Sequence, residues 1–126
     1  MNIKKLPESE LEIMQVLWDA EGAVYRNHFD RQLKDTKHWT DSTILSLLSR
    51  LQEKGFLRCT KDGNRNVYEA VITKAEYLAY EDQHFLHAFH KNSIRHLVAS
   101  MVASNDLTDE DLNDLEAYLE ERKKGG

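Results

Sequence analysis

Small hydroxyl side chains cover one face of a helix predicted over residues 40–54, and they suit the recognition of a closely packed partner. The apolar stripe of this helix recurs at helical spacing: Ile44, Leu47, Leu48 and Leu51. The other face carries Ser42, Ser46 and Ser49. A helix that meets only water usually carries more Lys and Glu on its outer face. Small hydroxyls instead favour close contact with a surface such as the groove of DNA.

Four of the six histidines lie within residues 84–96, and imidazole is a ligand for Zn²⁺ or Cu²⁺. These residues are His84, His87, His90 and His96. The first three step by three residues, so they drift around a helix and one ion cannot easily take all of them. We interpret them as solvated or interface histidines and expect no metal ligands and no cofactor. A metal-responsive site completed across a dimer remains the alternative.

Cys59 is the single cysteine, which excludes an internal disulfide and fits a reducing cytosol. We interpret it as a small buried strand residue. No apolar run is long enough to span a bilayer, and the N-terminus lacks the layout of a signal peptide. The expected location is therefore cytoplasmic. No catalytic Ser/His/Asp grouping, Gly-rich phosphate loop or His-Glu-x-x-His motif is present, so we expect no enzyme.

The elements that must hold the hydroxyl face form the pattern of a winged helix-turn-helix over residues 1–73. Pro7 can open a first helix, and a second is expected over about residues 26–37. Thr40 is a good N-cap for the third helix, which ends at Gly55. A hairpin follows near residues 57–61 and 65–71, around the turn signal Asp62-Gly63-Asn64.

Three further helices are expected in the second half of the chain, over about residues 74–91 and 93–104 and from Thr108 onward. About fifty residues in three helices make a thin core for an independent domain. We therefore predict a homodimer through residues 74–126. The expected fold class is mainly α with a small β-hairpin, a winged helix-turn-helix followed by a three-helix dimerisation domain.

The net charge of −5 is unevenly distributed along the chain. Residues 1–73 are neutral, with 11 basic and 11 acidic residues, whereas residues 74–126 carry 6 and 11. Residues 50–65 hold five basic and two acidic residues. Nucleic-acid binding requires such a local basic surface rather than a basic chain. The charge pattern therefore permits DNA contact by the first domain and argues against it in the second.

The order of several segments resembles the BlaI/MecI/CopY family of bacterial repressors over nearly the whole chain. The similar segments are residues 9–18, 39–43, 47–51, 54–55, 97–100, 106–108 and 112–119. The resemblance implies a dimeric repressor that binds double-stranded DNA at a palindromic operator with TACA/TGTA-type half-sites. It implies control of an operon for β-lactam resistance or copper homeostasis.

By position, the resemblance places a set of DNA-binding candidates on the third helix and the wing: Thr40, Asp41, Ser42, Thr43, Ser46, Arg50, Lys61 and Arg65. The N-terminal residues of the helix would meet base edges, while the last three would meet phosphates.

The sequence differs from the family pattern at three places. Asp41 and Ser42 stand where many relatives have Pro-Lys. Ser100 and Met101 replace the Asn-Phe bond that is cleaved in the β-lactam branch. The C-terminal cysteine cluster of the copper branch is missing. The inducing signal is therefore open, and a winged-helix module that binds protein rather than an operator is a further alternative.

Overall fold

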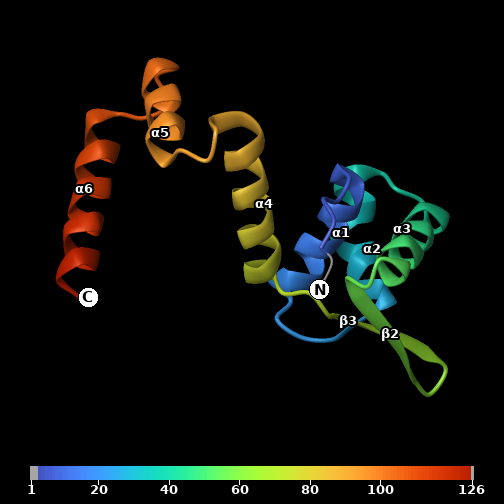
Figure 1. The fold of residues 1–126 in the computed structure, drawn as a ribbon. Helices are drawn as coiled ribbons and strands as arrows, with labels where there is room; N and C mark the ends of the chain where they lie inside the picture. The colour runs from blue at the N-terminus through green and yellow to red at the C-terminus, as the bar shows by residue number, and fades with distance from the viewer. Residues whose placement is uncertain (1–2, 126) are drawn as a thin grey trace. The chain divides into compact units, whose positions relative to one another are not determined.

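The computed structural model describes residues 3–125, and its contacts divide the chain into two compact units, residues 1–81 and residues 82–126. The division lies inside a helix, eight residues after the expected boundary at residue 73. The first unit contains three helices, a small sheet and the start of a fourth helix. The second contains the rest of that helix and two more (Figure 1).

Three helices enclose the core of the first unit: α1 (Glu8–Asp19), α2 (Arg26–Lys37) and α3 (Asp41–Glu53). The apolar stripe predicted for α3 is buried in this core. It packs with side chains from α1 and α2: Ile13, Met14, Leu17, Phe29 and Leu33. The stripe therefore fixes which face of α3 points outward.

Local signals at the ends of α3 set its length. The Thr40 hydroxyl accepts a hydrogen bond from the backbone N–H of Thr43 at 3.2 Å, which satisfies one free donor of the first turn. At the other end, the N–H groups of Gly55 and Phe56 donate to the carbonyls of Gln52 and Leu51. Gly55 has φ +80°, so this is a Schellman end, in which glycine adopts a left-handed conformation without steric cost.

The first unit also contains a three-stranded antiparallel sheet in the order β1-β3-β2, of which β2 and β3 follow α3 in the chain. The hairpin of β2 (Leu57–Asp62) and β3 (Arg65–Ala70) forms as predicted and projects away from the helices as the wing (Figure 1). Strand β1 (Val24–Tyr25) was not predicted, and it pairs with Tyr68 and Val67 of β3. It fastens the segment between α1 and α2 to the wing.

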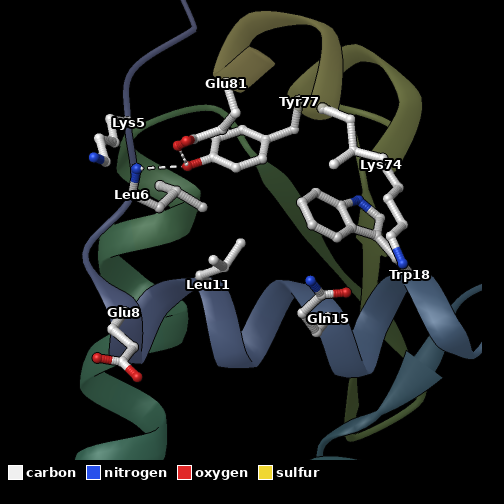
Figure 2. A pocket seen from close by; sticks show the side chains of 10 residues that line it. Lys5, Leu6, Glu8, Leu11, Gln15, Trp18, Lys74, Tyr77 and Glu81 are labelled. Atoms are coloured by element: carbon white, nitrogen blue, oxygen red, sulfur yellow. Dashed lines mark hydrogen bonds between the residues drawn. The ribbon is translucent and has the colours of Figure 1, made fainter. Parts of the chain in front are cut away.

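Helix α4 (Lys74–His90) is attached to the first unit through Tyr77, whose side chain is buried. Its hydroxyl accepts a hydrogen bond from the backbone N–H of Leu6 at 2.9 Å and donates to Glu81 at 2.6 Å (Figure 2). Burial and the nearby carboxylate raise the pKa of Tyr77 to about 12. The start of α4 is thereby part of the winged-helix core.

The second unit continues with α5 (Ile94–Ala103) and α6 (Asp109–Lys124), close to the predicted helices. Thr108 and Asp111 form a capping box at the start of α6. Neither α5 nor α6 contains a buried residue. The expected fold class is confirmed. The second unit leaves large apolar side chains of α4, α5 and α6 exposed: Phe85, Phe89, Ile94, Met101, Val102, Leu115, Tyr118 and Leu119.

Candidate DNA-binding surface

The outer face of α3 presents the predicted hydroxyls to solvent. Ser42, Thr43, Ser46 and Arg50 are exposed, and all four border one shallow hollow on this face. Thr40 precedes them as the N-cap, and its hydroxyl oxygen lies 3.1 Å from that of Thr43. The face therefore offers short hydrogen-bonding groups near the helix N-terminus and one cation three turns along.

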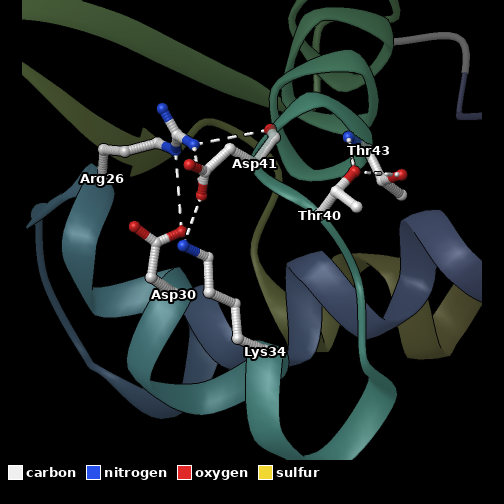
Figure 3. A network of polar contacts seen from close by, with 6 residues as sticks. All are labelled: Arg26, Asp30, Lys34, Thr40, Asp41 and Thr43. Atoms are coloured by element: carbon white, nitrogen blue, oxygen red, sulfur yellow. Dashed lines mark hydrogen bonds and ion pairs between the residues drawn. The ribbon is translucent and has the colours of Figure 1, made fainter.

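Asp41 is engaged within the protein at the start of the same helix. Its carboxylate lies 2.5 Å from Nζ of Lys34 and 3.4 Å from Nη2 of Arg26, both on α2 (Figure 3). The Lys34 ammonium lowers the pKa of the Asp41 carboxyl, and the carboxylate in turn raises the pKa of Lys34. Arg26 also reaches the backbone carbonyl of Asp41 at 3.4 Å. Asp41 thus joins α3 to α2.

Arg26 connects this network to Asp30, whose Oδ1 lies 3.8 Å from Nε of Arg26. Both of these atoms are buried, and neither has a hydrogen-bond partner in the described part of the chain. The pair is therefore held by charge attraction without the hydrogen bond that such groups usually form. Arg26 and Lys34 are not among the predicted site residues, although their helical spacing to Asp30 on α2 indicates a charged face.

The wing carries both paired and unpaired cations. Nε of Arg58 donates to Oε1 of Glu69 at 2.8 Å across the β2–β3 ladder. Arg65 places its guanidinium carbon 3.6 Å from the ring centroid of Tyr25, whose hydroxyl donates to Asp62. That hydrogen bond raises the pKa of Tyr25. Lys61 is exposed and forms no ion pair within residues 3–125.

The fold reduces the basic excess counted over residues 50–65. Lys54 lies 2.5 Å from the buried carboxylate of Glu10, and Arg58 is paired with Glu69. Both carboxylates lie outside the counted window, so the sequence count overestimates the free positive charge. Among the described residues, Arg50 and Lys61 are the cations of that window that have neither an ion pair nor a ring contact.

The histidines of the second unit come together only in part. Nδ1 of His90 lies 2.9 Å from Nδ1 of His96, and Nδ1 of His87 lies 3.1 Å from the side-chain amide of Asn92. The described residues contain no group of three or more His, Cys, Asp or Glu side chains arranged to hold a metal ion. In the same residues, no helix is long and apolar enough to cross a membrane.

Comparison with known proteins identifies a family over almost the whole chain. The family model described as penicillinase repressor matches residues 6–121. A penicillinase repressor of Bacillus licheniformis is 32% identical over 124 residues, which cover 96% of each chain. The methicillin resistance regulatory protein MecI of Staphylococcus aureus is 24% identical over 118 residues, 94% of this chain and 95% of the relative.

Two solved structures are similar to part of the chain. The solution structure of the DNA binding domain of the repressor BlaI has a TM-score of 0.54 and 33% identity, over 60% of this chain and 92% of that one. A structure of the monomeric Bacillus licheniformis BlaI in complex with the blaP half-operator covers the same shares, with a TM-score of 0.52. With the family model, these similarities confirm the resemblance seen in the sequence, and the chain belongs to the penicillinase repressor family, the family of BlaI and MecI.

Proposed function

We propose that this protein is a cytoplasmic, dimeric repressor that binds a palindromic operator and controls a resistance operon. The observation that carries the proposal is the exposed hydroxyl face of α3, placed beside a wing with a free cation. The same winged-helix fold occurs in the BlaI structure that contains the blaP half-operator. The N-terminal turns of α3 would enter the major groove, where short polar side chains reach base edges.

The contacts divide into two kinds. Ser42, Thr43 and Ser46 lie where they would read base edges, while Arg50, Lys61 and Arg65 would contact phosphates. Phosphate contacts release counterions, so each one steepens the dependence of affinity on salt. Arg65 would act from its position over the Tyr25 ring, which fixes the direction of the guanidinium.

The exposed apolar side chains of the second unit support a dimer. Because α5 and α6 bury no residue in a single chain, their apolar faces need a cover. A second copy through residues 74–126 would provide it, and two winged helices would then reach the two half-sites of a palindrome.

Fluorescence anisotropy tests the proposal on a TACA/TGTA palindrome and on a scrambled duplex of equal length at ~150 mM salt. We expect the palindrome to bind about a thousandfold more tightly, which is typical of specific regulators. Equal and weak binding to both would contradict operator recognition. It would favour the alternative of a winged helix that binds a protein partner.

Two substitutions on α3 separate the kinds of contact. Arg50→Ala should weaken binding to every duplex and lower the salt slope by about one. Ser46→Ala should leave the slope unchanged and alter the preference at one base position. An Arg50→Ala variant with unchanged affinity and slope would show that α3 docks differently.

A further inference from the structure

An apolar pocket lies on the first unit, between the N-terminal segment, α1 and the start of α4 (Figure 2). Its volume is about 410 Å³, within the range of roughly 300–1,000 Å³ that is usual for small-molecule sites. Leu6, Leu11, Trp18, Tyr77 and Leu78 form its walls. None of these residues belongs to the proposed DNA-binding face, so the pocket has no role in the proposed contacts with DNA.

The polar groups in the walls already have partners within the protein. Nε1 of Trp18 donates to the carbonyl of Ile72 at 2.9 Å, and the Tyr77 hydroxyl is held between Leu6 and Glu81. The Trp18 and Tyr77 rings lie with centroids 5.8 Å apart and are tilted by 34°. An occupant would therefore meet fixed ring surfaces and aliphatic carbon, which favour an aromatic or alkyl body.

The charges around the pocket differ between its two ends. Lys5, Glu8 and Glu81 lie on the side of the N-terminal segment, whereas Lys74 lies beside Trp18 at the other end (Figure 2). Lys74 forms no ion pair within the described residues. The first end thus carries a net negative charge, and Lys74 is the charged residue of the pocket lining at the second end. Glu21 and Glu69 border the neighbouring hollow with Lys74, and Glu69 is paired with Arg58.

We propose that this pocket binds a small amphipathic carboxylate, with its apolar body between Leu11, Trp18 and Tyr77 and its carboxylate at Lys74. The apolar body gains free energy from leaving water, and the ammonium selects an anion at one end. Glu8 and Glu81 repel a carboxylate from the opposite end, so the ligand has one preferred orientation.

Calorimetric titration of the full chain with 4-phenylbutyrate and with 4-phenylbutanol tests the proposal. The two probes share the apolar body and differ in the charged group. We expect the carboxylate to bind about fivefold more tightly than the alcohol, as suits a partly exposed ion pair. Lys74→Met should remove this preference, while the matched control Lys5→Met should keep it.

A third variant tests the location of the site. Gln15→Trp adds bulk at the pocket floor from the half-buried surface of α1, outside the core. Both probes should lose binding to this variant, while its circular dichroism and melting stay those of the parent protein.

Three results would overturn the proposal. They are the absence of saturable binding up to ~10 mM, binding that Gln15→Trp leaves unchanged, and a carboxylate preference that survives in Lys74→Met. Saturable binding would be absent if the pocket were closed to small molecules in the full protein. The titrations contain no DNA, so a negative result on ligand binding is independent of whether the protein binds an operator.

Discussion

Asp41 lies in the first turn of α3, where its negative charge opposes the approach of DNA. Its carboxylate pairs with Lys34 and Arg26 and so links α3 to α2. We predict that Asp41→Asn strengthens binding to any duplex and steepens the salt slope by about one, because Lys34 becomes free to contact a phosphate. Anisotropy titrations across a range of salt concentrations measure both effects. The control is Asp35→Asn, since this exposed carboxylate has no ion pair among the described residues.

The same substitution should also change the acid stability of the protein. Lys34 lowers the pKa of Asp41 in the folded state, so the pair stabilises the fold above the ordinary carboxyl pKa. This contribution is lost as the pH falls through the lowered pKa. Asp41→Asn should therefore melt slightly earlier than the parent at neutral pH and show less change on acidification. Unchanged DNA affinity together with unchanged melting would contradict the link to α2.

Lys61 and Arg58 lie in the same strand of the wing, but their charges are available to DNA to different extents. Arg58 is paired with Glu69, whereas Lys61 has no ion pair within residues 3–125. Lys61→Ala should therefore weaken binding to all duplexes and lower the salt slope by about one. Arg58→Ala should have a smaller effect on both quantities. The reverse order would show that the Arg58–Glu69 pair opens on DNA.

Tyr77 shows how one buried hydroxyl fixes an element, since it holds both the N-terminal segment and the start of α4. Tyr77→Phe leaves the buried N–H of Leu6 without its acceptor, and we expect the free energy of unfolding to fall by about 1–2 kcal/mol. Urea denaturation measures this change. Tyr118→Phe is the control, because the Tyr118 side chain is exposed. Equal stability of the two variants would contradict the attachment of α4 through Tyr77.

Alkaline pH gives a second measurement of the same contact. The pKa of Tyr77 rises from 10.0 to about 12 in the folded state, so the folded chain holds this proton more tightly than the unfolded chain. Its contribution is complete below pH 10 and is lost as the pH rises through about 12. Tyr77→Phe should therefore lose less stability than the parent protein over this interval. Identical pH profiles would contradict the expected role of the hydroxyl.

Elements set by local chemistry could be predicted from the sequence, whereas elements set by distant contacts could not. Thr40, Gly55 and Thr108 specify helix ends through bonds to residues within one turn, so the helices lie close to their predicted positions. Strand β1 has two residues and exists through its pairing with β3, more than forty residues later. No local periodicity can reveal such a short strand.

The charge of the recognition surface shows the same limit at the scale of the whole molecule. The sequence locates α3 and the wing correctly, and it places the candidate hydroxyls on the exposed face. It could not show that Glu10 and Glu69 neutralise two cations, because these pairs form across the fold. The distance between His90 and His96 likewise depends on the turn between α4 and α5, where Lys91 and Asn92 have positive φ.

The second unit leaves many large apolar side chains exposed in a single chain, and this property leads to a prediction for the whole assembly. Charged substitutions in its apolar surface, Met101→Glu and Leu119→Glu, should convert the expected dimer into monomers in sedimentation experiments at micromolar concentration. Because α5 and α6 bury no residue of their own chain, their helical signal in circular dichroism should fall as well. The first unit keeps its core, so binding to a single half-site should survive.

The affinity for the full palindrome then measures whether the protein is a dimer. Two linked winged helices gain from binding both half-sites, and this gain is commonly about 100- to 10,000-fold. The monomeric variants should lose most of that advantage on the full palindrome while binding an isolated half-site as the parent does. Glu120→Gln, beside Leu119 on α6, is the matched control and should remain dimeric. If Leu119→Glu still sediments as a dimer and binds the palindrome normally, the exposed surface of α6 is not the interface, and the two half-sites must be joined through another part of the chain.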